Sequence, residues 1–346
     1  MAREAFRIVI CDDSATYRTA LAGFLEHDPA IRVEATFGTA EEMLRALGSI
    51  DPDLITLDLE MPGMGGIRAI ESIMRDRPVP ILVLSEYAGK GSERAAEALA
   101  AGALEAAVKS SLRLFEPDDV WATASRSRIK RLASLQLKRR ARGGRVGAEP
   151  PPARALDGPV RAIGIGASTG GPPALTKVLS QLPADFPLPV MVVQHIAPGF
   201  SAGLVSWLDR NVPLPVRFGA AGAEMGPGIW FAPDDAHLRL GSTMRFSLDT
   251  TRHGAHRPSV DILFESLAAE VGEGTVGVVL TGMGRDGAEG VEAIRAAGGR
   301  TVAQDEASSA VFGMPRAAID SGADLVLALD DVGPALRRLR KAGALA

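Results

Sequence analysis

Short apolar runs alternate with longer helical stretches along both halves of the chain. In the first half the apolar runs are RIVIC, RVEATF, LITLDL, PILVLS and LEAAVK. In the second half they are RAIGIGAS, VMVVQHI, GIWFAP, TVGVVLTG and TVAQD. Strands that alternate with helices imply right-handed βαβ units and a parallel sheet covered on both faces. The pattern predicts an α/β fold in each half, with the chemistry gathered at the C-terminal ends of the strands.

A change of composition separates the two halves. A chain of 346 residues exceeds what one hydrophobic core usually serves. The segment SRSRIKRLASLQLKRRARGGR carries nine Lys or Arg and no acidic residue, and it gives way to AEPPPARALDGP. We therefore predict one domain over residues 1–122, a basic and then Pro-rich interdomain linker over 123–158, and a second domain over 159–346.

The first part of this linker keeps the apolar spacing of a basic helix, at Ile129, Leu132, Leu135 and Leu137. Such a helix could contact nucleic acid or a membrane surface. We favour a solvated interdomain helix, because a DNA-binding protein should continue with a short helical module, whereas a long βα-patterned region follows here. No nucleic-acid partner is expected.

The remaining composition indicates a cytoplasmic protein. The net charge of −4 gives no nucleic-acid footprint for the chain as a whole. The single cysteine, Cys11, excludes an internal disulfide and lies inside the apolar run RIVIC, where we expect it to be buried. No secretory-length apolar stretch precedes the first acidic pair, and no later segment is long enough to span a bilayer, so membrane insertion is not expected.

Polar side chains follow four predicted strands of the first half. Asp12 and Asp13 close the first strand, Asp58 the third, Ser85 the fourth and Lys109 the fifth. Crowded carboxylates repel one another unless a cation lies between them, and oxygen ligands suit Mg²⁺. The carboxylate of Asp58 could then attack a phosphoryl group whose oxygens Ser85 and Lys109 would bind. Helix capping could explain one or two of these aspartates, but not all five positions.

The first half resembles the receiver domains of two-component response regulators, in ICDDS, in LITLDLEMPGMGG and in LSEYAGKGS with the later lysine. The resemblance implies a flavodoxin-like, five-stranded, doubly wound domain, Mg²⁺ held by Asp12, Asp13 and Asp58, and phosphorylation of Asp58 by a partner histidine kinase. Receiver domains usually carry an aromatic residue three positions before the lysine and a proline just after it. This chain has Ala106 and Ser110 there.

The segment GIGASTGG presents one serine, Ser168, between a predicted strand and a predicted helix that begins near Pro172. Residues 166–170 have the G-x-S-x-G form of a nucleophile elbow, and the helix directs its positive N-terminal dipole toward the serine. The competing interpretation is a nucleotide-binding loop, which needs G-x-G-x-x-G and an acidic residue at the next strand's end. The glycine spacing is one residue too long, and the next strand ends in His195.

His195 and Asp286 complete a candidate catalytic triad with Ser168. Each of the three follows a predicted strand, so one crevice could gather them, with His195 as base and Asp286 fixing the imidazole tautomer. An N-cap role would explain Asp286 nearly as well if it stood alone. His253 and His256 have an H-x-x-H spacing without a further ligand that would strengthen a metal site, and we favour substrate contact or plain loop structure for them.

The second half resembles the catalytic domain of the chemotaxis protein-glutamate methylesterases (CheB). The resemblance rests on GIGASTGGPPAL, VVQHIAPGFS, FAPDDAHLRL, HRPSVDILFESLA and the long segment that begins VVLTGMGRDGAEG. It implies a doubly wound, mostly parallel sheet, the triad Ser168, His195 and Asp286, and no cofactor in this domain. We predict hydrolysis of methyl esters of glutamate on the cytoplasmic helices of chemoreceptors, and deamidation of receptor glutamines at the same site. Thr169 and Met283 are candidates for supporting the serine and the oxyanion.

Two alternatives remain at the level of the sequence. The first is a non-catalytic two-component signalling adaptor with a Rossmann-like output domain that uses the same glycines. The second is a DNA-binding regulator, supported only by the basic segment.

Overall fold

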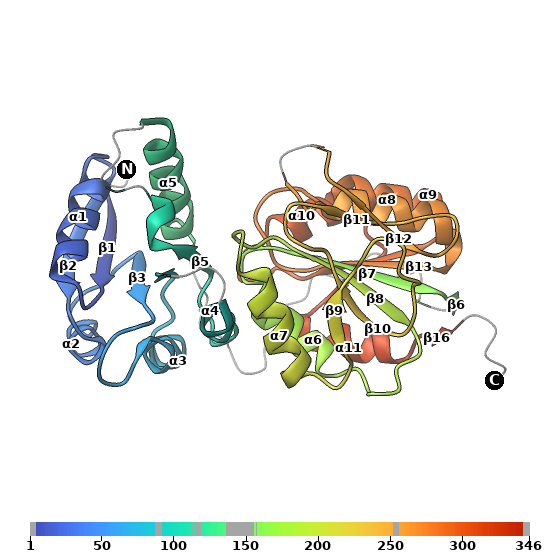
Figure 1. The fold of residues 1–346 in the computed structure, drawn as a ribbon, viewed down its shortest axis with the longest axis horizontal. Helices are drawn as coiled ribbons and strands as arrows, with labels where there is room; N and C mark the ends of the chain where they lie inside the picture. Colours follow the sequence, from blue (N-terminus) through green and yellow to red (C-terminus); the bar gives the residue numbers. More distant parts are fainter. Residues whose placement is uncertain are drawn as a thin grey trace. The chain divides into compact units, whose positions relative to one another are not determined.

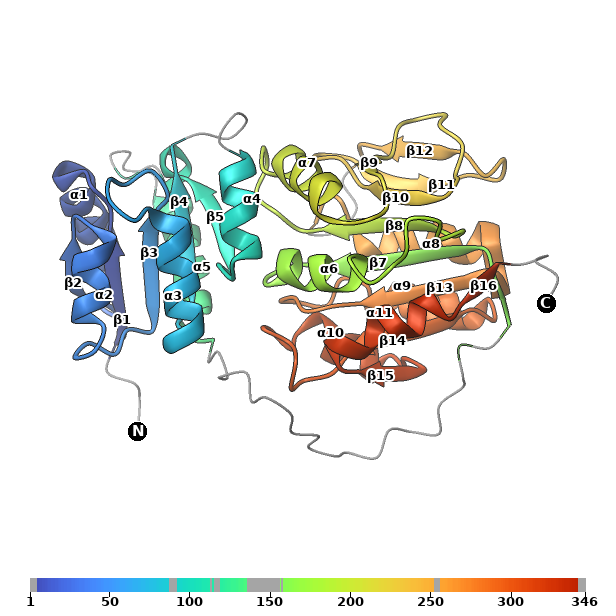
Figure 2. The same cartoon turned by 90° about the horizontal axis from the view of Figure 1, so that it is seen from below.

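The structure is a computed structural model that describes residues 5–86, 92–112, 114, 119–135, 156, 158–251 and 256–341. The chain divides into two compact units, Met1–Ala141 and Arg142–Ala346. Figures 1 and 2 show a sheet with helices on both faces in each unit. The predicted α/β class is confirmed for both halves.

The first unit contains a five-stranded parallel sheet in the order β2-β1-β3-β4-β5. Its strands are β1 (Phe6–Cys11), β2 (Ile31–Phe37), β3 (Leu54–Asp58), β4 (Ile81–Ser85) and β5 (Glu105–Val108). All five were predicted from the apolar runs. The strand order reverses direction between β1 and β3, and this switch point is where doubly wound sheets open a crevice at their C-terminal edge.

Helices cover both faces of this sheet. They are α1 (Ala15–Glu26), α2 (Ala40–Ala46), α3 (Gly66–Asp76), α4 (Ser92–Ala100) and α5 (Asp119–Ala133), with a short 3-10 turn η1 (Lys109–Leu112). α1 and α5 lie on one face, and α2, α3 and α4 lie on the other (Figure 1). The side chains of Ser14 and Thr39 cap α1 and α2, because each accepts a hydrogen bond from an amide of the first turn.

The predicted boundary between residues 122 and 123 is wrong, because it falls inside α5. This helix packs against β1 and belongs to the first unit. Its apolar positions Ile129 and Leu132 are buried, and Lys130 forms an ion pair with Asp28 at 2.6 Å. Lys130 of this basic helix thus contributes to the fold of the first unit, as does Arg128, which forms an ion pair with Glu105 at 2.6 Å. Residues 136–155, which hold the rest of the predicted linker, lie outside the described residues.

The second unit contains a seven-stranded parallel sheet in the order β15-β14-β13-β7-β8-β10-β9. Its strands are β7 (Ala162–Ala167), β8 (Pro189–Gln194), β9 (Val216–Phe218), β10 (Gly228–Phe231), β13 (Thr275–Val279), β14 (Arg300–Gln304) and β15 (Leu325–Leu327). The predicted strands β7, β8, β10, β13 and β14 form its centre. The sequence patterns missed β9 and β15, which are three residues long and lie at the edges.

Two small sheets flank the seven-stranded sheet. β11 (His237–Leu240) and β12 (Phe246–Asp249) form an antiparallel hairpin, and β6 (Pro159–Val160) pairs with β16 (Arg340–Lys341) in parallel. Neither sheet was predicted.

Six helices described in the second unit cover the two faces of the large sheet. They are α6 (Gly171–Leu179), α7 (Ser201–Asn211), α8 (Val260–Val271), α9 (Ala288–Ala296), α10 (Met314–Asp320) and α11 (Leu329–Arg337), with a 3-10 turn η2 (Gly272–Gly274) after α8. α8, α9 and α10 lie together on one face, and α6, α7 and α11 lie on the other (Figure 1).

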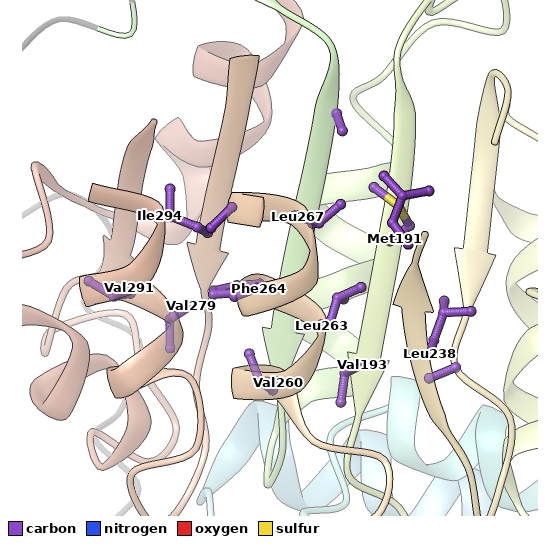
Figure 3. Close-up of a cluster of buried hydrophobic side chains, with 14 of the residues drawn as sticks. Met191, Val193, Leu238, Val260, Leu263, Phe264, Leu267, Val279, Val291 and Ile294 are labelled. Atoms are coloured by element: carbon purple, nitrogen blue, oxygen red, sulfur yellow. The ribbon is translucent and has the colours of Figure 1, made fainter. Parts of the chain in front are cut away.

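Close packing of α8 on β7 explains two glycines of the GIGASTGG segment. Figure 3 shows Val260 and Phe264 of α8 in the hydrophobic cluster between this helix and the sheet. A Cβ at Gly166 would lie 2.3 Å from the Val260 side chain, and one at Gly164 would lie 2.9 Å from the Phe264 ring. Full burial of a side chain such as Phe264 stabilises the fold by roughly 1.5–3 kcal/mol. These two glycines therefore permit the packing of a helix on β7.

Within the part of the chain that the structure describes, none of the helices has the length and apolar character needed to cross a bilayer.

Candidate functional sites

Ser168 follows β7 in a tight turn that leads directly into α6. The N–H of Ser168 donates to the carbonyl of Thr281 at 3.0 Å, and its carbonyl accepts from the N–H of Gly171 at 2.7 Å. Gly170 caps α6 in the left-handed region with φ 74°, a conformation that favours glycine. The side chain of Ser168 is half-buried. The turn therefore places Ser168 just before the N-terminus of α6 and at the C-terminal edge of the sheet.

The loop after β13 approaches this serine closely. A Cβ at Gly282 would lie 2.8 Å from the Cβ of Ser168 and 2.3 Å from the sulfur of Met314. Only a residue without a side chain allows the loop to approach so closely at that point. Gly282 thereby places the next residue, Met283, beside the serine turn.

His195 follows β8, which is the strand next to β7 in the sheet. The Nε2 atom of His195 lies 2.7 Å from Oδ2 of Asp286, which belongs to the loop between β13 and α9. Both side chains are largely buried, at 10% and 7% exposure. The Nδ1 atom of His195 is also buried, and it has no hydrogen-bond partner among the described residues. The structure thus brings His195 and Asp286 into contact, and His195 follows the strand next to the one that Ser168 follows.

The carboxylate of Asp286 is anchored at the N-terminus of α8. Oδ1 accepts hydrogen bonds from the Ser259 hydroxyl at 2.8 Å and the Asp261 N–H at 3.0 Å, and Oδ2 accepts from the Val260 N–H at 2.8 Å. Together with His195, four donors face these two oxygens. The positive end of the α8 dipole adds to their effect. Asp286 is therefore held as an oriented, ionised acceptor for the imidazole.

A second carboxylate mirrors this arrangement. Asp261, in the first turn of α8, accepts from the N–H groups of Gly287 and Gly290 at the start of α9, each at 2.8 Å. Asp286, which precedes α9, thus caps α8, and Asp261, which lies in the first turn of α8, caps α9. This reciprocal capping joins the N-termini of α8 and α9 beside the candidate triad.

The two carboxyl groups have opposite pKa shifts. Burial acts to raise the pKa of Asp286, but the hydrogen bond from His195 and the surrounding amides outweigh it and leave this pKa well below its ordinary value. Burial, with the nearby charge of Asp286, raises the pKa of Asp261 to about 7 despite the hydrogen bond from Gly290. Asp286 therefore ionises at a lower pH than Asp261 does.

His256 stacks on the candidate base. Its ring centroid lies 4.3 Å from that of His195, with 12° between the ring planes. Burial and the neighbouring His195 lower the pKa of His256, so it stacks as a neutral ring near pH 7. His253, the other histidine of the H-x-x-H spacing, lies outside the described residues.

The two predicted supporting residues, Thr169 and Met283, lie next to the serine turn. Thr169 is buried, and its carbonyl accepts from the hydroxyl of Thr281 at 3.0 Å. Met283 is half-buried in the loop that Gly282 brings against Ser168.

In the first unit, the predicted carboxylates gather at one edge of the sheet. Ligand oxygens of Asp12, Asp13 and Asp58 lie within 4.8 Å of one another. Asp12 and Asp58 are buried, whereas Asp13 is exposed. The Nζ atom of Lys109 lies 2.7 Å from Oδ2 of Asp12 and 2.9 Å from Oδ2 of Asp58. Hard oxygen donors in this arrangement, open to solvent on one side, fit a Mg²⁺ ion.

The same cluster determines the charge states around Lys109. Burial acts to lower the pKa of Lys109, but the hydrogen bonds to Asp12 and Asp58 outweigh it and raise the pKa above its ordinary value. Ser85 is buried at the end of β4, the strand next to β3, which ends at Asp58. The predicted five residues therefore meet at the edge formed by β1, β3, β4 and β5.

Sequence reasoning missed three residues around the candidate triad of the second unit. Ser259 and Asp261 flank the start of α8, where S-V-D before an apolar helix is a recognisable N-terminal signal, but nothing in that signal names Asp286 as their partner. Gln194, the last residue of β8, is buried and hydrogen-bonded to the backbone of both Ser168 and His195. No local pattern marks it.

Comparisons with known proteins match both halves of the chain to described families. Residues 163–336 match the family CheB methylesterase, and residues 8–113 match the family Response regulator receiver domain. A protein-glutamate methylesterase/protein-glutamine glutaminase of Anaeromyxobacter dehalogenans is 42% identical over 337 residues, which cover 97% of either chain. A protein with the same description from Pseudomonas aeruginosa is 38% identical and covers 95% of either chain.

A solved structure, the CheB methylesterase catalytic domain of Thermotoga maritima, is 38% identical and aligns with a TM-score of 0.50. The alignment covers 51% of this chain and 97% of that domain. The predicted combination of a receiver domain and a doubly wound catalytic domain is thus confirmed. The chain belongs to the CheB family of protein-glutamate methylesterases/protein-glutamine glutaminases.

Proposed function

We propose that this chain is a protein-glutamate methylesterase that uses Ser168, His195 and Asp286, and that its receiver unit accepts a phosphoryl group. The observation that carries the proposal is the 2.7 Å contact between His195 and Asp286 at the strand edge that also presents Ser168. The hydroxyl, the imidazole and the carboxylate come from three separate segments of the chain. Nucleophilic catalysis by serine requires the three groups to converge, and the contact of two of them next to the Ser168 turn supports this assignment.

The contact between His195 and Asp286 supports one direction of proton transfer. An ionised Asp286 can only accept a hydrogen bond, so the neutral imidazole of His195 carries its hydrogen on Nε2. Nδ1 is then left as the base. Serine hydrolases of the chymotrypsin type use the opposite arrangement, in which Nδ1 faces the aspartate. In this chain, Nδ1 of His195 would take the proton of the Ser168 hydroxyl.

The reaction then follows in two stages. The oxygen of Ser168 attacks the carbonyl carbon of a γ-glutamyl methyl ester while Nδ1 takes the hydroxyl proton. The tetrahedral adduct expels methoxide, which receives that proton and leaves as methanol. Water, deprotonated by Nδ1, attacks the acyl-serine, and collapse of the second adduct returns the proton to the serine oxygen and releases glutamate.

The negative oxygen of both adducts needs donors that are fixed in advance. The N–H of Met283 is our candidate, because Gly282 brings this loop against Ser168. Thr169 would support the turn from the other side. Removal of one such donor in other enzymes costs about 2.7–4 kcal/mol of transition-state stabilisation.

The substrate class follows from the relatives that are described as protein-glutamate methylesterase/protein-glutamine glutaminase. We infer that the methylated cytoplasmic helices of chemoreceptors are the substrate. An amide and an ester pass through the same tetrahedral adduct, so receptor glutamines would also be deamidated. No cofactor takes part in this chemistry. A cytoplasmic location would place the enzyme beside these receptor helices.

The receiver unit would take its phosphoryl group from a chemotaxis-type histidine kinase. Asp58 would be the acceptor, and Asp12, Asp13 and Asp58 would hold the Mg²⁺ ion that neutralises the transferring phosphoryl group. Lys109 already contacts Asp58 and would bind a phosphoryl oxygen, as would Ser85.

Phosphorylation would regulate the esterase by shifting a population of states. In this hypothesis the unphosphorylated receiver blocks the catalytic crevice, and phosphorylation favours an open arrangement. The rate of the segment 159–346 compared with that of the full chain tests this. Equal rates for the two, with no response to a phosphate donor, would show that the receiver does not inhibit.

Methanol release from methylated receptor fragments tests the proposed function, with and without acetyl phosphate and Mg²⁺. Ser168→Ala is expected to abolish methanol release and labelling by a fluorophosphonate while Asp58 is still phosphorylated. Retained esterase activity in this variant would refute the assignment. A wild-type protein that neither reacts with the fluorophosphonate nor releases methanol would favour the adaptor.

A further inference from the structure

The side chain of Gln194 connects the two segments that carry Ser168 and His195. Gln194 is 6% exposed and is the last residue of β8. Its Nε2 amide donates to the carbonyl oxygen of Ser168 at 2.8 Å and to that of His195 at 2.7 Å. Two carbonyl acceptors require a donor, so the amide nitrogen must occupy this position. Both hydrogens of the amide are therefore used on the proposed nucleophile and base.

The position of Gln194 compensates for the end of the β ladder. The last pair between β7 and β8 joins Ala167 to Gln194, and the N–H of His195 makes the final main-chain bond, to the carbonyl of Ala167 at 2.9 Å. Ser168 and His195 are the first residues beyond this pairing. The Gln194 amide bridges the carbonyls of Ser168 and His195 just beyond the last main-chain hydrogen bond between the two strands.

The side-chain oxygen of Gln194 lowers the stability of the fold, because the arrangement leaves it without a hydrogen-bond donor. Oε1 is buried and has no hydrogen-bond partner among the residues that the structure describes. The neighbouring N-terminus of α6 offers no donor, because the N–H of Gly171 already binds the Ser168 carbonyl and the next two residues are prolines. A buried unpaired acceptor destabilises a fold by about 1–3 kcal/mol. Stability alone therefore does not explain a glutamine here.

Gly171 leaves the space that Gln194 occupies. A Cβ at residue 171 would lie 2.0 Å from Oε1 and 2.8 Å from the carbon of the Gln194 amide group. No side chain at residue 171 is compatible with the amide in its present position. The glycine and the glutamine thus form one fitted arrangement below the serine turn.

We propose that Gln194 is a positioning residue that sets the distance between the Ser168 hydroxyl and the Nδ1 atom of His195. The inference rests on the proposed esterase function and deepens it. Gln194 does not touch the reacting atoms. It acts by fixing the backbone of the nucleophile and of the base relative to one another.

Gln194→Met tests this role, because methionine fills a similar volume and cannot donate. A displacement of about 1 Å between reacting groups costs on the order of 10²-fold in rate. We expect kcat for methanol release to fall by about 10- to 100-fold, with the KM for methylated receptor changed less than about two-fold. The rate of fluorophosphonate labelling should fall by the same factor. Tm should fall only modestly, because the removal of the unpaired Oε1 partly offsets the loss of the two hydrogen bonds of the amide.

Gln181→Met is the matched control, because the amide of Gln181 donates to the carbonyl of Lys177 within the α6 region and touches neither catalytic segment. Its kcat and labelling rate should equal those of the wild type. Gln194→Leu is the second variant. It also removes both donors with an apolar side chain and should reproduce the loss of kcat, so it carries the test if Gln194→Met does not fold.

A folded Gln194→Met protein with wild-type kcat and labelling rate would overturn the positioning role. So would a variant whose only change is a higher KM. If the wild-type protein itself releases no methanol and is not labelled, the proposed function fails and the role of Gln194 fails with it.

Discussion

Replacement of Asp286 by asparagine tests the proposed direction of proton transfer most directly. The carboxylate accepts from four donors, two on each oxygen: Ser259 and Asp261 on Oδ1, Val260 and His195 on Oδ2. Asparagine keeps the shape of the side chain but converts one of these oxygens into a donor. Both orientations of the new amide therefore lose contacts.

If the amide nitrogen replaces Oδ2, it points a hydrogen at the Val260 N–H and forces Nε2 of His195 to become an acceptor. The proton then sits on Nδ1, and the base is blocked. If the nitrogen replaces Oδ1, it faces the Asp261 N–H, which cannot turn away. In this orientation the tautomer of His195 survives, but the charge that stabilises the imidazolium is lost.

The expected loss is large in rate and moderate in stability. The equivalent substitution in chymotrypsin-like proteases lowers kcat by about 10⁴. We expect a loss of kcat of about 10³- to 10⁴-fold, which equals about 4–5.5 kcal/mol at 1.36 kcal/mol for each factor of ten. The lost interaction with the α8 dipole adds a destabilisation of about 0.5–2 kcal/mol.

Single-turnover methanol release from methylated receptor fragments measures the chemical step, and urea unfolding measures stability. The stability difference between wild type and Asp286→Asn should shrink as the pH falls below about 4, because the folded-state pKa of Asp286 is depressed and its stabilisation is lost on protonation. Asp324→Asn is the control. Asp324 is also a buried acceptor, but it binds Thr301 near the start of β14. More than about one tenth of wild-type kcat in Asp286→Asn would refute the reasoning.

Three further substitutions test other parts of the structure. Lys109→Met should destabilise the receiver unit by about 3–5 kcal/mol in urea unfolding without metal, because it leaves Asp58 beside another buried carboxylate, and millimolar Mg²⁺ should restore part of the loss. Asp261→Asn should gain stability relative to the wild type as the pH rises from about 4 to about 7, because the raised pKa of Asp261 makes its ionisation in the folded state unfavourable. Gly282→Ala should lower kcat by about 10²-fold, because its Cβ would displace the loop from Ser168.

A control variant or a contradicting result can be stated for each of these three predictions. Lys130→Met removes an ion pair of more exposed side chains and should cost only about 0–1 kcal/mol, and an equally small effect of Lys109→Met would contradict the charge argument. A pH-independent stability difference for Asp261→Asn would show that this carboxyl does not titrate in that range. Wild-type kcat in a folded Gly282→Ala protein would show that the loop can move without consequence for the serine.

The sequence by itself determined the repeating βα pattern, the central strands of both sheets and the strand ends that carry the chemistry. Periodicity and strand-end position are local properties, so the apolar runs place Asp58, Ser168 and His195 just where their strands stop. The same local patterns misassigned the start of the linker. The apolar spacing of Ile129 and Leu132 marks a helix, but it does not reveal that the helix packs on β1.

Only the tertiary structure decided how these residues meet. His195 and Asp286 are 91 positions apart, and nothing in either segment specifies that Nε2, and not Nδ1, faces the carboxylate. The same holds for the reciprocal capping of α8 and α9 and for the hydrogen bonds of Gln194 to two strand ends. These contacts join segments that are distant in sequence, and no local pattern encodes their proximity in space. The physical reason is that propensity and periodicity act over a few neighbouring residues, whereas the orientation of a side chain depends on every segment packed around it.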